Sequence, residues 1–155
     1  MKTNLYEHRS GLKVIPAEII CNVRNVVASV EAELSKNSVT IIKKEIKQKL
    51  EQIGWMGEYR LDPVSKITIT SFYDGIGLCL QTGNVSRIYA DILKLQTLYT
   101  KGKITAAIII TPEFDTAKEL GYNMANSDRL IRELPIFNQV ITMPIVIVAF
   151  DGMED

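Results

Sequence analysis

Few side chains in this sequence can act as a thiol nucleophile, a histidine base or a soft metal ligand. His8 is the only histidine, and Cys21 and Cys79 are the only cysteines. A single histidine excludes histidine-rich metal sites and most histidine-dependent catalysis, unless His8 supplies it. The cysteines lie in apolar surroundings, which predicts buried free thiols in a reducing compartment. A nucleophilic Cys79 would need a lowered thiol pKa and a nearby base, so we favour a role as a small core residue.

Cys79 lies in a segment whose pattern predicts a β-hairpin. Residues 66–72 alternate between apolar and polar types, as a half-buried strand does. Asp74 and Gly75 follow, and this pair supplies the positive φ angles of a tight hairpin turn. Residues 76–82 then form the returning strand. Asp74 is therefore interpreted first as a turn residue.

The register of this hairpin follows from the length of its turn. With a two-residue turn, Tyr73 pairs with Ile76, and Thr70 falls opposite Cys79. Gln81 then stands near the end of the returning strand. Thr70, Cys79 and Gln81 are therefore predicted to lie close together.

The remaining hydrophobic pattern alternates between helices and strands. Apolar residues recur at helical spacing after Pro16 and again before Gly54, which suits a helix end. The expected elements are helices at 16–34, 41–53 and 86–101, a strand at 104–111, helical stretches near 113–121 and 126–134, and a strand at 143–150. The helix between two strands favours their parallel pairing. The fold class is therefore α/β, with a mixed sheet of about four to five strands flanked by helices and a helical N-terminal half.

Two predicted helices, at 41–53 and 86–101, carry charged side chains with alternative interpretations. The helix at 41–53 has lysines on its outer face, interpreted as a solvated surface: Lys43, Lys44, Lys47 and Lys49. Glu45 borders the apolar face of this helix. In the helix after the hairpin, Asp91 is spaced to form a local ion pair with Arg87 or Lys94.

The bulk composition fits an ordinary globular protein. The 155 residues suit one domain spanning 1–155, with 46% hydrophobic and 23% charged residues. Eighteen basic and eighteen acidic residues give a formal net charge of zero, so the basic excess of many nucleic-acid binders is absent. The chain has no apolar run long enough for a bilayer and no apolar leader. We therefore expect a cytoplasmic protein without a membrane partner.

Several local sequences resemble the BglII-type restriction endonucleases of the PD-(D/E)XK nuclease superfamily. The resemblance is carried by Gly77-Leu-Cys-Leu-Gln-Thr-Gly-Asn84, by 85–96 after it and by Ile108-Ile-Ile-Thr-Pro112. Tyr6-Glu-His-Arg9 and Gly54-Trp55 fit the same family. The resemblance implies a restriction-endonuclease-like core that cuts double-stranded DNA with Mg²⁺. A homodimer is expected, because two-fold symmetry suits cleavage of both strands of a palindrome.

The resemblance also assigns the candidate site residues. Gln81 matches the glutamine that replaces the lysine of other nucleases, while Cys79 and Thr70 stand where the two catalytic acids are expected. A hydroxyl and a soft thiolate are poor ligands for a hard ion. Asp74, if it reached inward, and Glu45 are the candidate metal ligands that would replace these acids. Arg87 and Lys94 are the candidate DNA-binding residues.

Three functions follow from these assignments. The first is a BglII-like endonuclease whose cleavage is retained or weakened. The second is a non-catalytic module for binding DNA or protein, favoured by the missing acids, while the retained Gln81 speaks for the first. The third is thiol chemistry at Cys79. If the protein is an enzyme, it is a Mg²⁺-dependent site-specific deoxyribonuclease of type II.

Overall fold

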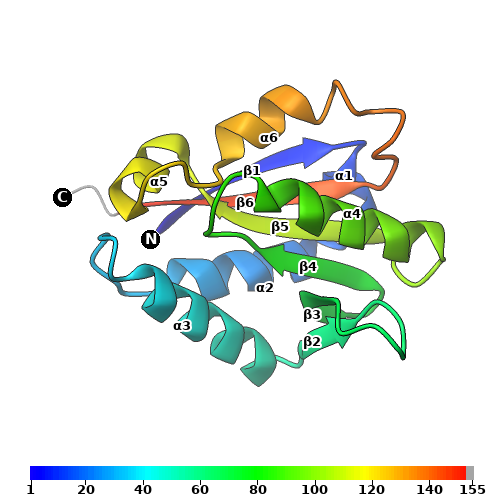
Figure 1. Ribbon diagram of the computed structural model, residues 1–155. Helices are drawn as coiled ribbons and strands as arrows, with labels where there is room; N and C mark the ends of the chain where they lie inside the picture. The colour runs from blue at the N-terminus through cyan, green and yellow to red at the C-terminus, as the bar shows by residue number, and fades with distance from the viewer. Residues whose placement is uncertain (153–155) are drawn as a thin grey trace.

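A six-stranded sheet with helices on both faces forms the centre of the molecule (Figure 1). The computed structural model describes residues 1–152. The strands are β1 Lys2–His8, β2 Met56–Arg60, β3 Thr68–Tyr73, β4 Ile76–Leu80, β5 Ala106–Pro112 and β6 Ile145–Asp151. Their order across the sheet is β1-β6-β5-β4-β3-β2. The predicted α/β class with a mixed sheet is confirmed, with six strands in place of four to five.

The middle of the sheet is parallel and its edges are antiparallel. β4 pairs in parallel with β5, and β5 with β6. β3 and β2 extend one side by antiparallel pairing, and β1 pairs antiparallel with β6 on the other. All seven residues of β5 are buried, because helices cover both faces of a central parallel strand.

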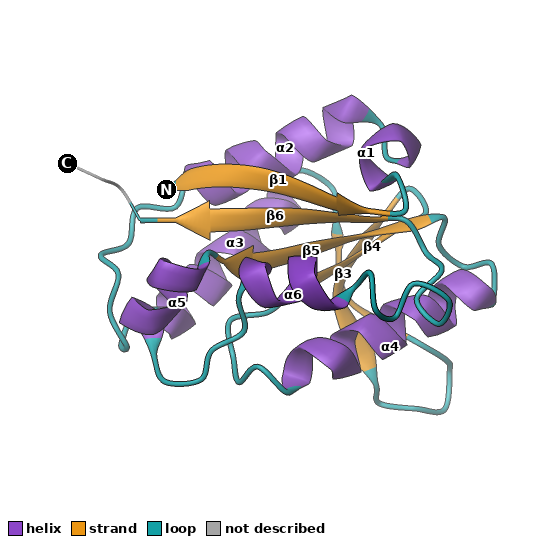
Figure 2. Cartoon of the chain, turned by 90° about the horizontal axis from the view of Figure 1, so that it is seen from above, coloured by secondary structure: helices purple, strands orange, loops and turns teal. Residues whose placement is uncertain are grey.

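Helices cover the two faces as separate layers (Figure 2). They are α1 Gly11–Val14, α2 Ala17–Ala28, α3 Val39–Gln52, α4 Arg87–Thr100, α5 Phe114–Leu120 and α6 Ser127–Glu133. Apolar residues of α2 and α3 pack in one core with alternate residues of the central strands. The apolar faces of α4 and α6 pack against the other alternate set. Within residues 1–152, no helix is long and apolar enough to cross a bilayer.

Two strands lie in the part of the chain that was predicted to be helical. β1 and β2 are edge strands whose mostly polar residues give no clear alternation in the sequence. β1 pairs with β6 at the opposite end of the chain, with Lys2 beside Asp151. Local pattern cannot reveal such a strand, because its hydrogen-bonding partner is what makes it a strand.

The helix after Pro16 is shorter than its apolar stripe suggested. α2 ends at Ala28, whereas the prediction extended to Leu34. Val30 is nevertheless buried and Leu34 packs on the core, both from an irregular segment. The prediction was wrong here because burial in a loop imitates helical spacing over a few residues.

Candidate functional site

The predicted hairpin forms as expected and then opens into a fork. Tyr73 pairs with Ile76 across a two-residue turn, in which Asp74 and Gly75 have φ angles of 47° and 75°. This register continues to Ser71 and Leu78 and then stops.

Beyond that pair, a side-chain hydrogen bond takes the place of the backbone hydrogen bonds between β3 and β4. The Oγ1 atom of Thr70 accepts a hydrogen bond from the backbone N–H of Leu80, at 3.0 Å. β4 remains paired with β5 on its other side as far as Leu80. The backbone N–H of Gln81 donates to the Ile110 carbonyl at 2.8 Å, so the end of β4 stays fixed while β3 separates from it.

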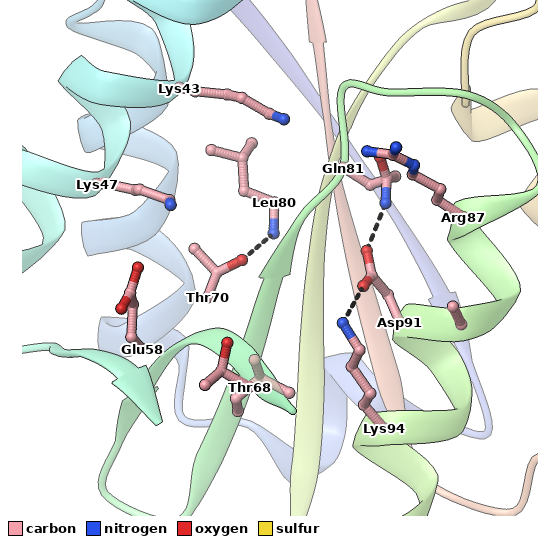
Figure 3. A pocket seen from close by; sticks show the side chains of 12 residues that line it. Lys43, Lys47, Glu58, Thr68, Thr70, Leu80, Gln81, Arg87, Asp91 and Lys94 are labelled. Carbon is pink, nitrogen blue, oxygen red and sulfur yellow. Dashed lines mark hydrogen bonds and ion pairs between the residues drawn. The ribbon is translucent and has the colours of Figure 1, made fainter. Parts of the chain in front are cut away.

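A pocket of about 400 Å³ lies at this fork, between α3 and α4 (Figure 3). We call it the fork pocket. Its lining is Lys43, Lys47, Glu58, Thr68, Ile69, Thr70, Leu80, Gln81, Arg87, Ala90, Asp91 and Lys94. Four of these residues are basic and two are acidic, so the pocket carries an excess of two positive charges although the whole chain is neutral.

Gln81 connects the end of β4 to α4. Its Nε2 donates to Oδ2 of Asp91 at 2.6 Å, and its Oε1 accepts from the backbone N–H of Gly83 at 2.8 Å. Oδ1 of Asp91 pairs with Nζ of Lys94 at 3.3 Å, which realises one of the two ion pairs predicted for Asp91. Gln81 is buried, and both ends of its amide are therefore used in positioning this wall of the pocket.

Lys43 and Lys47 face the pocket from α3; Lys47 is exposed, as the prediction of a solvated lysine face expected, whereas Lys43 is half-buried and contradicts it. One helical turn separates them, and Figure 3 shows both amines directed toward the fork. Burial lowers the pKa of Lys43, as do the nearby charges of Lys47 and Arg87, while Asp91 acts in the opposite direction. Within residues 1–152, neither lysine forms an ion pair or hydrogen bond, so both amines can meet an anion.

Glu58 is an acidic lining residue that no sequence pattern singled out. It lies in β2, between residues that pair with Ser71 and Ile69 of β3. Its φ of 50° places it in the left-handed region, which typically costs a residue other than glycine about 1–3 kcal/mol. The neighbouring strand thus holds a carboxylate near Thr70 that only the sheet pairing brings there.

Cys79 is a core residue, as its sequence surroundings favoured. Its exposed fraction is 1%, and it packs with the apolar face of α4. Burial, and next the charge of Asp91, raise the pKa of its thiol, against smaller opposite effects of the Thr70 backbone and Lys94. The only histidine cannot activate it, because His8 lies in β1 with β6 and β5 between, and its Nε2 is 2.7 Å from the Ile141 carbonyl oxygen. These features do not support thiol chemistry.

Of the other predicted site residues, two line the pocket and two do not. Arg87 and Lys94 contribute to its wall from α4. Asp74 stands at the hairpin tip, and Oε2 of Glu45 lies 3.8 Å from Nζ of Lys49 on α3. Neither Asp74 nor Glu45 belongs to the pocket lining.

The donor groups of the fork pocket do not fit a Mg²⁺ ion. Mg²⁺ requires several oxygen ligands, of which carboxylates are the usual protein donors. The Thr70 hydroxyl already accepts from Leu80, and Asp91 is engaged by Gln81 and Lys94. Within residues 1–152, Glu58 is the one carboxylate of the lining without a hydrogen bond or ion pair, and the soft Cys79 sulfur is buried outside the lining. Among residues 1–152, no group of three or more His, Cys, Asp or Glu side chains could hold a metal ion.

The fold is that of a restriction endonuclease. The structure matches a crystal structure of restriction endonuclease BglII complexed with a DNA 16-mer, with a TM-score of 0.82 and 13% sequence identity, over 100% of this chain and 81% of that one. It also matches a crystal structure of free BglII with a TM-score of 0.72 and 15% identity, over 100% of this chain and 82% of that one.

The sequence itself matches the family described as Restriction endonuclease BglII/BglIII over residues 3–150. The chain therefore belongs to the BglII/BglIII restriction endonuclease family, and the predicted resemblance is confirmed. No significant match was found among curated proteins.

Proposed function

We propose that this protein binds double-stranded DNA at the fork pocket and that its metal-dependent cleavage is lost or strongly weakened. The observation that carries the proposal is a basic pocket lined by Thr70, one of the two positions where the family resemblance places an acid. We further propose that residues 1–155 act as a single domain and that the protein binds DNA as a homodimer.

The charge of the pocket supports binding of the DNA backbone. Phosphate contacts by lysine and arginine supply most of the sequence-independent affinity for DNA. Lys43, Lys47 and Arg87 form no ion pair within the described residues, whereas Lys94 is paired with Asp91. Three cations therefore remain for phosphates on the pocket wall, and Arg87 keeps the DNA-binding role that the resemblance implied.

The chemistry of the two acid positions supports the loss of cleavage. In metal-dependent hydrolysis, the ion polarises the phosphate and lowers the pKa of the attacking water. Thr70 and Cys79 cannot hold such an ion, and Gln81 is occupied in joining β4 to Asp91. Gln81 is in this view a positioning residue that shapes the wall of the DNA site.

The first test measures binding and cutting on the same DNA. Purified protein is incubated with mixed-sequence duplexes in Mg²⁺, in Mn²⁺ or with chelator, and is analysed by gel shift and by denaturing gel. We expect retention that weakens with salt and is equal with chelator, and no cutting. Lys44→Ala is the control for substitutions of the pocket lysines, because Lys44 is exposed on α3 and does not line the pocket.

Two results would contradict the proposal in different ways. Absence of DNA retention at low salt would refute DNA binding and favour a protein-interaction module. Metal-dependent cutting that Asp91→Asn abolishes would refute the loss of cleavage, and would identify Asp91 as the replacement for a missing acid.

A further inference from the structure

The position of the Lys43 amine inside the fork pocket suits a nucleophile. It lines the fork pocket from α3, is partly buried and is directed toward the fork (Figure 3). The volume of about 400 Å³ falls within the range of about 300–1,000 Å³ that is usual for small-molecule sites. The pocket can therefore hold one sugar-phosphate unit and not only the edge of a backbone.

The surroundings of Lys43 favour the reactive form of its amine. A lysine becomes nucleophilic when it is desolvated or lies beside another cation. Both conditions hold here, because burial, Lys47 and Arg87 all lower the Lys43 pKa. Lys44, on the same helix, is exposed and does not line the pocket.

The same pocket offers a carboxylate that can accept a proton. Glu58 lines the pocket from β2, and its carboxylate forms no hydrogen bond or ion pair within residues 1–152. Asp91 is less suitable, because Gln81 and Lys94 already engage both of its oxygens. An amine on α3 and a free carboxylate on β2 that line one basic pocket are not needed for phosphate binding alone.

We propose that Lys43 attacks abasic sites in DNA, so that the protein acts as an abasic-site lyase; this inference rests on the proposed DNA binding. A sugar that has lost its base opens to an aldehyde, which is an electrophile that an amine meets in DNA. The Lys43 amine adds to the C1′ carbonyl, and water leaves as the imine forms. Glu58 takes the C2′ proton, the electrons of that bond form a C2′–C3′ double bond, and the C3′–O bond breaks.

The products of this step balance without any further reactant. The 3′ phosphate departs with the electron pair of the broken C3′–O bond and becomes the 5′ phosphate of the downstream fragment. Water then hydrolyses the imine, which returns the Lys43 amine and leaves an unsaturated aldehyde on the upstream strand. No metal, oxidant or reductant takes part, in agreement with the poor fit of the pocket for Mg²⁺.

The experiment traps the imine on a duplex with a single abasic site. Borohydride reduces the imine to a stable adduct, which is quantified on a denaturing gel and mapped by peptide mass spectrometry. We expect an adduct at Lys43 that persists with chelator, is lost in Lys43→Arg and remains in the control Lys44→Ala. Glu58→Gln should slow strand scission more than it reduces trapping, because it removes only the proton acceptor.

Binding to intact duplex is measured in parallel to separate the two proposals. Lys43→Arg keeps the positive charge and should bind intact duplex more tightly than Lys43→Ala, although it cannot form an imine. Binding of intact duplex without an adduct, or an adduct that maps to another lysine or persists in Lys43→Arg, would overturn the lyase proposal alone. Failure of the wild type to bind intact duplex would overturn the proposed function and the lyase with it.

Discussion

The salt dependence of DNA binding tests the fork pocket most directly. Lys43, Lys47 and Arg87 are the basic lining residues that no acidic side chain pairs within the described chain. Each phosphate contact contributes about −0.9 to the slope of log K against log salt. Three contacts in each protomer contribute about −2.7 to the slope, and Lys43→Ala or Arg87→Ala should reduce this contribution per protomer to about −1.8.

These slopes correspond to measurable changes in affinity. Between about 50 and 200 mM salt, the contacts of each wild-type protomer should account for a loss of about 40-fold in affinity, and those of each protomer of either single variant for about 12-fold. Fluorescence anisotropy of a labelled duplex over a salt series measures both slopes. Lys44→Ala is the control, because it removes an equal charge from the same helix outside the pocket. The reasoning is refuted if Lys44→Ala flattens the slope as much as Lys43→Ala does.

Two further predictions concern stability, and both are measured by urea unfolding. Lys43→Met should stabilise the fold by a few tenths to about 1 kcal/mol near neutral pH. The folded state lowers the pKa of Lys43, so at low pH folding carries the full penalty of holding the charged amine. The stability gained by Lys43→Met should therefore shrink as pH rises from the folded-state pKa toward the unfolded-state pKa. A stability gain that grows with pH would contradict this. Cys79→Glu, which restores an acid where the family resemblance places one, should cost roughly 3 kcal/mol, because the position is 1% exposed and lies among apolar side chains. A neutral effect would mean that this face of β4 can open toward the pocket.

Sequence alone predicted the hairpin turn and the register of its first three pairs, whereas the predicted pairing of Thr70 with Cys79 does not form, because β3 separates from β4 after Ser71. The Asp74-Gly75 pair can adopt positive φ angles, so the turn length follows from local chemistry, and the register follows from the turn. The same reasoning placed Thr70, Cys79 and Gln81 together; Thr70 and Gln81 both line the fork pocket, whereas Cys79 is buried in the core and does not. The family resemblance of the block at 77–96 was also visible in sequence, and the family match over residues 3–150 confirmed it.

Sequence reasoning did not find the rest of the pocket. Lys43 and Lys47 were expected on a solvated helix face, because helical spacing shows which residues share a face but not which other elements lie against that face. Glu58 lies in an edge strand that the pattern did not reveal, and Asp91 was expected only to pair locally. Lys43, Lys47 and Glu58 reach the pocket from α3 and β2, which precede the hairpin, and Asp91 reaches it from α4, which follows β4.

The sequence by itself therefore determined the α/β class, the hairpin, the family and the absence of acids at positions 70 and 79, since all of these depend on residue identity and short-range geometry. Only the tertiary structure decided that a neutral chain carries a basic pocket. Charges gather there because β3 parts from β4 after Ser71, and α3 and α4 then converge on the gap from opposite faces of the sheet. Net charge sums over the whole surface, whereas a phosphate responds to the few side chains within the Debye length of about 10 Å.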